Sequence, residues 1–199
     1  MKKFVLTGDS ADEITRYIEE SWLTKAELEI ASELLKVVTN GDQERITWFS
    51  RLGPSIRHII MNTHAYRSGL EFGFDNLNLG KYGWLESREF LAVERLEFGR
   101  IKDSCHHSYI RIGRGVNGIW AYGISYCFGS AGGVSPLSVF NTKFPSREAV
   151  IDASIKELKN MMMERVGDPD TGNFNPKLIQ CTLRDIDTYM CNSIQLSLF

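Results

Sequence analysis

The densest group of potentially reactive side chains in this 199-residue chain is Cys105-His106-His107. A thiol and an imidazole could together bind zinc, or act as a nucleophile with its general base. Adjacent residues of a strand point to opposite faces, so at most Cys105 and His107 would share a side. No further pair of ligands is spaced to complete a metal site. The sequence therefore predicts no metal and no cofactor, and it favours a non-enzymatic role over catalysis.

Two other groups of residues could bind ions. Asp168 with Asp170, and Asp185 with Asp187, have the alternate spacing at which paired carboxylates bind a divalent cation. Both pairs lie in or beside a turn-rich stretch, where aspartate is common because its side chain accepts hydrogen bonds from the local backbone. The glycine-rich segment 129–135 could bring backbone N–H groups close to an anion. A flexible connection beside a sheet is the alternative that the sequence favours there.

Aromatic residues alternate along segment 118–129, so several of them would line one face of a strand. If that face were exposed, the rings would form a platform for nucleobases, with arginines nearby to contact phosphates. If it were buried, the same rings would form the core beneath a helix, which the sequence favours. The residues that would contact a ligand or nucleic acid under the first alternative are Arg111, Arg114, Trp120, Tyr122 and Tyr126.

Composition and charge limit the class of protein. Hydrophobic residues make up 43% of the chain and charged residues 24%, which is typical of a globular protein in water. The formal net charge is −2, so contact with DNA would need a local basic patch. No segment has the length and apolarity of a signal peptide or membrane span, which predicts a cytoplasmic protein without a membrane partner. The four cysteines lack C-x-x-C spacing and are expected to be free thiols.

Helical periodicity dominates residues 1–68, which we expect to form a helical lobe. Ser10 and Glu13 have the spacing of a helix-capping box, and Thr24 and Glu27 repeat that spacing before the next apolar stripe. Two more helical segments follow, which gives four predicted helices in this lobe.

The helices around residues 24–64 faintly resemble a bacterial helix-turn-helix of the response-regulator type. That resemblance implies a helix beginning near Ser55 in the major groove, with Arg57 near base edges and Arg51 and Arg67 near phosphates. The segment departs from the pattern, because its second helix is about a turn too long. Large aromatic residues also stand where a small one is wanted. A plain helical bundle explains the same helices without DNA, and the sequence favours it.

The character of the sequence changes after a stretch at 69–88 that is rich in glycine and asparagine. Four segments rich in β-branched and aromatic residues follow, and we expect an antiparallel meander from them. A helix beginning after Ser146 would cover one face of that sheet. The four expected strands lie in residues 90–101, 108–115, 118–129 and 136–144.

These segments together predict an α+β protein. The expected parts are a helical lobe over 1–68, a β-meander with one covering helix over 69–166, and a linker with a C-terminal tail over 167–199. The first two parts could form one domain. Residues 178–189 could add a short helix or strand before the tail.

The sequence ends with Gln195-Leu196-Ser197-Leu198-Phe199. These five residues resemble the short peptide by which bacterial polymerases, mismatch-repair proteins and some DNA methyltransferases dock onto the replication sliding clamp. The resemblance covers this peptide alone and implies the bacterial DNA polymerase sliding clamp as partner. The glutamine amide could hydrogen-bond at the rim of a groove, and the leucines and phenylalanine could fill apolar pockets. Packing of the same residues on the protein's own core is the alternative.

The sequence therefore predicts an accessory or regulatory protein of bacterial, phage or plasmid DNA replication or repair. Docking on the clamp would either carry the folded part of the protein to replicating DNA or block the groove against other clients. The alternative is a protein of phage or mobile-element origin that binds a small molecule or nucleotide and has no clamp partner. That alternative would use the glycine-rich segment 129–135 and the aromatic sheet.

Overall fold

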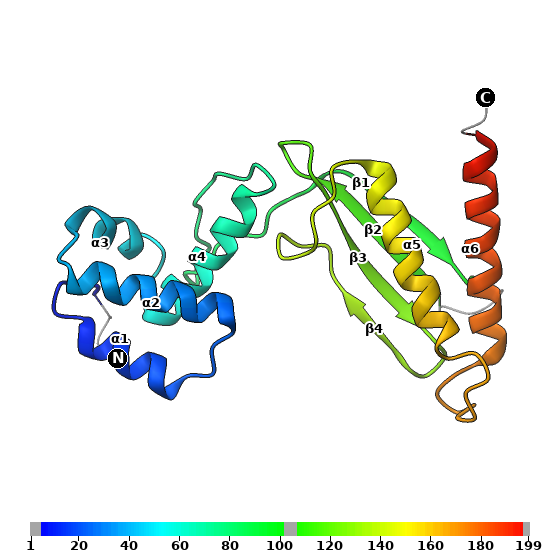
Figure 1. Cartoon of the computed structure of the whole chain (residues 1–199), viewed down its shortest axis with the longest axis horizontal. Coiled ribbons are helices and arrows are strands. Elements are labelled where there is room, and N and C mark those ends of the chain that lie inside the picture. The colour runs from blue at the N-terminus through cyan, green and yellow to red at the C-terminus, as the bar shows by residue number, and fades with distance from the viewer. Residues whose placement is uncertain (1–4, 102–106, 197–199) are drawn as a thin grey trace. The chain divides into compact units, whose positions relative to one another are not determined.

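The computed structural model describes residues 5–101 and 107–196, with residues 194–196 described by their backbone alone (Figure 1). Helices and an antiparallel sheet occur in separate stretches of the chain, so the α+β class is confirmed. The chain divides into two compact units, Met1–Glu89 and Phe90–Phe199. The segment 69–89, which the sequence grouped with the sheet, belongs to the first unit.

The first unit contains four helices, as the periodicity predicts. They are α1 (Ala11–Glu20), α2 (Lys25–Thr39), α3 (Gln43–Ser50) and α4 (Ile56–Leu70). The capping box predicted at Thr24 and Glu27 is present, with each side chain bonded to the other residue's backbone. The capping box predicted at Ser10 and Glu13 is not formed, because the Ser10 side chain accepts no hydrogen bond from the first turn of α1. The helices enclose one apolar core, which includes Ile14, Leu34, Phe49, Leu52 and Ile59.

Residues 71–89 return to α4 and are fastened there by Asn62. The buried Asn62 amide donates to the carbonyls of Leu52 (2.6 Å) and Gly83 (2.8 Å), and its Oδ1 accepts from the Leu85 N–H (2.8 Å). A buried amide is stable only when such bonds are made, so this side chain specifies where the segment lies. His58 adds a second contact, since its ring stacks on Trp84 with 4.0 Å between centroids.

The second unit is built on a meander in the order β1-β2-β3-β4, with every neighbouring pair antiparallel. The strands are β1 (Leu91–Phe98), β2 (Ser108–Arg114), β3 (Trp120–Cys127) and β4 (Gly132–Ser135). The first three lie where the sequence predicts them.

The expected fourth strand over 136–144 is wrong, because β4 lies in the glycine-rich segment before it. The Phe128 N–H donates to the Ala131 carbonyl (2.9 Å), so the chain reverses directly after β3. Pro136 follows β4 and has no N–H to donate to a ladder. Within the described residues of 136–144, only Phe144 pairs with the sheet, through an isolated bridge to Trp120.

Two helices cover the sheet where the sequence predicts one. α5 (Arg147–Met163) lies against β2 and β3, and α6 (Pro176–Leu196) lies beside α5 and against β1 (Figure 1). Leu178, Ile179 and Ile186 of α6 are buried, so the first part of this helix belongs to the core and is not a tail.

Polar contacts fix both helices to β1. Arg147, at the start of α5, forms a bidentate ion pair with Glu94, with Nε–Oε1 at 2.7 Å and Nη2–Oε2 at 2.5 Å. The Gly99 N–H donates to the Asp185 carboxylate of α6 (2.9 Å). A Cβ at Gly99 would lie 2.0 Å from the Thr182 hydroxyl, so this close approach requires glycine.

The chain after β4 partly crosses the side of the sheet that α5 and α6 do not cover. A Cβ built on Gly123 would lie 2.3 Å from the Leu137 backbone nitrogen and 2.6 Å from the Pro136 carbonyl carbon. A Cβ on Gly113 would meet the Phe90 and Leu137 side chains. These strand glycines let residues 135–137 pass directly over one end of the sheet.

Replacing Asn62 with alanine should lower the free energy of unfolding of the first unit by about 2–3 kcal/mol, because the carbonyls of Leu52 and Gly83 and the N–H of Leu85 lose their partner. Chemical denaturation of the full chain followed by circular dichroism measures this change. Asn76→Ala, at an exposed position of the same segment, is the matched control and should cost less than about 0.5 kcal/mol. Equal losses in the two variants would contradict the role given to Asn62.

Candidate functional site

The aromatic residues of β3 lie on the face that the helices cover. Trp120 is 8% exposed, and Tyr122 and Tyr126 pack against the same core at its edge. Tyr122 hydrogen-bonds to Glu157 of α5. Burial, reinforced by that carboxylate, raises the pKa of the Tyr122 hydroxyl well above its usual range. These three rings therefore support the core alternative and do not form an exposed stacking platform.

The two candidate arginines of β2 lie on different faces. Arg111 and Arg114 are three residues apart, and alternation along a strand places their side chains on opposite sides of the sheet. Ile110 and Ile112 point into the core beneath the helices, so Arg111 points away from it. We call this second side the outer face. Its described strand side chains at the end away from Gly113 are Arg95, Glu97, Tyr109, Arg111, Ser125, Cys127 and Val134.

A compact polar cluster occupies this outer face, and it was not predicted from the sequence. Arg95 lies over the Tyr109 ring, with its guanidinium carbon 3.8 Å from the ring centroid. Its Nε lies 3.0 Å from Glu97 Oε1, and Arg100 lies 3.4 Å from the other oxygen of the same carboxylate. Polar and aromatic side chains alternate with other residues in 93–97 and 107–111, and this alternation was visible in the sequence. Which of them lie opposite one another depends on the register of β1 and β2, which the sequence does not reveal.

The predicted Cys105–His107 pair is only partly described. Cys105 lies outside the described residues. His107 Nε2 lies 3.1 Å from Arg95 Nη2 and 3.7 Å from Glu97 Oε1, so it belongs to the same polar cluster. Among the residues that the structure describes, no three histidine, cysteine, aspartate or glutamate side chains are grouped as metal ligands.

The two aspartate pairs have partners in the fold. Asp170 accepts from the backbone N–H and the side-chain amide of Asn173, and these hydrogen bonds lower the pKa of Asp170. Asp168 accepts from the Asp170 N–H (3.0 Å), as expected of a turn. In α6, Asp185 accepts from Gly99 and Asp187 pairs with Lys159 at 2.7 Å. The first pair therefore stabilises a local turn, and the second fixes α6 to the end of β1 and to α5.

The glycine-rich segment 129–135 is also tied to its surroundings. The Ala131 N–H donates to the Asn173 carbonyl (3.2 Å), and the Ser130 hydroxyl donates to the Gly172 carbonyl (3.0 Å). Its last four residues form β4. These contacts give the segment a structural role at the edge of the sheet.

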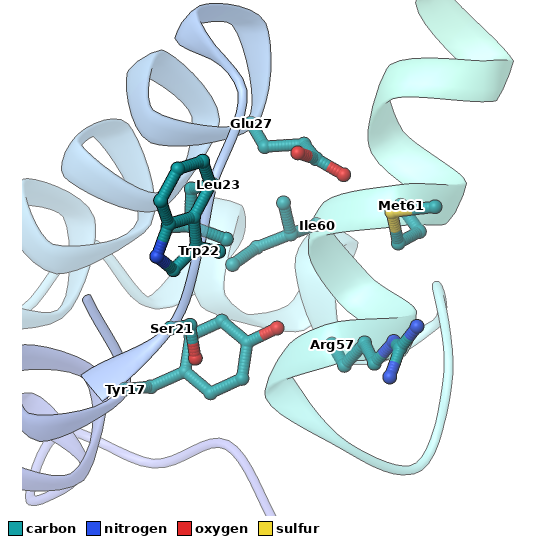
Figure 2. Close-up of a pocket in the computed structure, with 8 residues that line it drawn as sticks. All are labelled: Tyr17, Ser21, Trp22, Leu23, Glu27, Arg57, Ile60 and Met61. Atoms are coloured by element: carbon teal, nitrogen blue, oxygen red, sulfur yellow. The ribbon is translucent and has the colours of Figure 1, made fainter. Parts of the chain in front are cut away.

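The first unit has a groove of about 330 Å³ between the connection from α1 to α2 and the start of α4 (Figure 2). Figure 2 shows Arg57 on one wall and the Glu27 carboxylate above the buried Ile60. Trp22 is fully exposed at the rim. The residues lining the groove are Tyr17, Ser21, Trp22, Leu23, Glu27, Arg57, Ile60 and Met61.

The surroundings of the arginines favour the helical-bundle alternative over a DNA-reading helix. Arg57 shares its groove with the carboxylate of Glu27, which would repel phosphates. Arg67 forms a bidentate ion pair with Glu33, at 2.6 and 2.8 Å, and Arg45 binds the same carboxylate. The hydrogen bonds from Arg67 are the main cause that lowers the pKa of Glu33 below its ordinary value of 4.5.

Ser55 and His58 form a serine–histidine pair that sequence reasoning missed as such. The Ser55 hydroxyl lies 2.7 Å from His58 Nδ1 and also accepts from the His58 backbone N–H (3.3 Å). The other ring nitrogen lies 3.2 Å from the Tyr82 carbonyl oxygen. The hydroxyl therefore caps α4 while the imidazole holds segment 82–84, which is a structural arrangement.

The clamp-like peptide begins at the end of α6. Met190 is 41% exposed, and Cys191, Asn192 and Ser193 are exposed as well, so the helix leaves the core before it ends. The backbone of Gln195 and Leu196 continues the helix. The remaining predicted residues, Ser197, Leu198 and Phe199, lie outside the described residues.

Comparison with known proteins gives no relative from which a function could be transferred. The chain matches no protein-family model, no curated protein and no solved structure. None of the helices in the described part of the chain is long and apolar enough to cross a membrane. A function can therefore be inferred only from this chain's own residues.

Replacing Glu33 with glutamine should lower stability at neutral pH by up to about 1 kcal/mol, because the pair with Arg67 is partly exposed and screened. A carboxylate whose folded pKa is lowered stabilises the protein above its unfolded pKa, and this contribution disappears as pH falls through the folded value. The difference between natural chain and variant should therefore vanish in acid. Urea denaturation across about pH 3–7 measures it, and a difference that grew in acid would contradict the assignment.

Proposed function

We propose that this protein docks on the bacterial DNA sliding clamp through Gln195-Leu196-Ser197-Leu198-Phe199. The observation that carries the proposal is the sequence of this peptide, which has the amide, the apolar residues and the order of a clamp-binding segment. Exposure of Met190–Ser193 supports it, because the helix that leads to the peptide has already left the core.

The expected energetics suit a reversible contact. Burial of Leu196, Leu198 and Phe199 in apolar pockets contributes roughly 1.5–3 kcal/mol each. An extended bound peptide would first have to unwind the last turn of α6, whose terminal carbonyls lack helical partners in any case. After these ordering costs, a dissociation constant of about 1 μM is expected, near −8 kcal/mol.

Such an affinity fits an accessory or regulatory protein of bacterial, phage or plasmid DNA replication or repair that acts in the cytoplasm. Docking would either bring the folded units to replicating DNA or occupy the groove against other clients. The alternative of a nucleotide-binding protein without a clamp partner draws less support. The rings it would use belong to the core, and the glycine-rich segment is tethered to residues 172–173.

Truncating Phe199 to alanine in the full chain should weaken binding to a purified bacterial clamp by about 10-fold or more, because an apolar anchor is lost. Isothermal titration calorimetry measures the dissociation constant. Met190→Ala, at an exposed apolar position of α6 that precedes the peptide, is the matched control and should bind as the natural chain does.

Thermal unfolding separates docking from packing. If Phe199→Ala lowered the melting temperature and the natural chain gave no heat with the clamp, the peptide would belong to the protein's own core and the proposal would fail. Clamp-dependent DNA synthesis with and without the protein then distinguishes recruitment from blocking. An inhibited reaction that recovers with Phe199→Ala indicates blocking.

A further inference from the structure

The outer face of the sheet has an excess of positive charge concentrated on neighbouring strands. Arg95 and Arg111 are direct partners across β1 and β2, so two arginine side chains emerge side by side on this face. Arg100, whose side chain is 74% exposed, follows the end of β1. Against these three arginines, the part of the cluster that the structure describes contains one carboxylate, Glu97. Like charges placed opposite each other destabilise a sheet, so such an arrangement needs a compensating partner.

Glu97 compensates only part of this charge. Its carboxylate pairs with Arg95 at 3.0 Å and with Arg100 at 3.4 Å. Arg111 is exposed, and the described residues provide no carboxylate within ion-pair distance of it. Considering the described residues, the face therefore offers one arginine without an acidic partner and two that share the Glu97 carboxylate. Multiple arginines at this spacing are suited to successive phosphates.

An aromatic ring lies directly beside these charges. Tyr109 is the cross-strand partner of Glu97, and the Arg95 guanidinium lies over its ring at 3.8 Å. The Arg95 side chain remains 44% exposed. A guanidinium supported from below by an aromatic ring presents a planar surface on which an unpaired nucleobase can stack.

Small side chains lie beside the Tyr109 ring on the outer face. Ser125 is the β3 partner of Tyr109, and the next strand adds Val134, so the surface beyond the ring carries small side chains. Residues 135–137 cross the sheet over Gly123, the β3 partner of Arg111, and bound the face there. Beside that crossing, no described helix covers the outer face, which combines a stacking position with adjacent arginines as in proteins that bind single strands.

We propose that the outer face binds single-stranded nucleic acid. A base stacks on the Arg95–Tyr109 pair, and the neighbouring phosphates pair with Arg111 and Arg100. A duplex hides the faces of its bases from such a platform, and an acidic peptide has no ring to stack there. This site uses residues separate from the clamp-like peptide, so binding of nucleic acid can be tested independently of docking on the clamp.

Fluorescence anisotropy of the full chain with a labelled oligothymidylate of about 15 nucleotides tests the site at low salt. Arg111→Ala should weaken binding about 5-fold and reduce the slope of log affinity against log salt by about 0.7, because one phosphate contact is lost. Arg95→Ala should weaken it by about 5-fold or more through loss of the stacking surface. Arg114→Ala removes the same charge from the same strand on the other face, and it should bind as the natural chain does.

Several outcomes would overturn this proposal. They are absence of binding at low salt, equal losses in Arg111→Ala and Arg114→Ala, duplex binding as tight as single-strand binding, or full displacement by polyglutamate at equal charge. Circular dichroism must show that each variant melts as the natural chain does. If Arg111→Ala does not fold, Arg111→Lys, which keeps the charge, should retain the salt slope. Phe199→Ala should leave oligonucleotide binding unchanged, which separates this site from the clamp-like peptide.

Discussion

The second unit depends on a single constraint, that consecutive side chains of a strand leave the sheet on opposite sides. On one side the apolar residues of β1, β2 and β3 meet α5 and α6 and exclude water. The other side is then free to carry charge, because the core is already complete without it. The same alternation explains why Arg111 and Arg114, so close in sequence, have different surroundings. It also explains why the rings of β3 pack beneath the helices while the half-buried ring of Tyr109 lies on the outer face.

The first unit is organised in another way. Its helices close an apolar core, and Phe72 and Phe74 are buried directly after α4, but residues 75–89 are only half-buried or exposed. Asn62 and His58 supply the missing specificity through directed hydrogen bonds and ring stacking. A buried amide tolerates only one placement of its partners, so a segment rich in glycine still has a defined path.

The sequence predicted the helices of the first unit and three of the four strands, because these follow local periodicity and capping. It misplaced the fourth strand, since a chain reversal after Phe128 depends on hydrogen bonds that composition does not reveal. It gave α6 too small a role, because the burial of Ile179 and Ile186 requires a neighbouring helix to pack against. The cluster of Arg95, Tyr109 and Arg111 depends on strand register, a long-range property, whereas the clamp-like peptide is contiguous and could be read directly.

The path of residues 71–89 has a consequence for how this protein could be divided or recombined. A gene fusion that kept only the four helices would end at residue 70 and would strip Asn62 of its bonds to Gly83 and Leu85. The smallest fragment that keeps all the hydrogen bonds of Asn62 therefore extends beyond α4. We expect limited proteolysis to cut, and gene fusions to be tolerated, near residue 89, where one compact unit ends and the next begins.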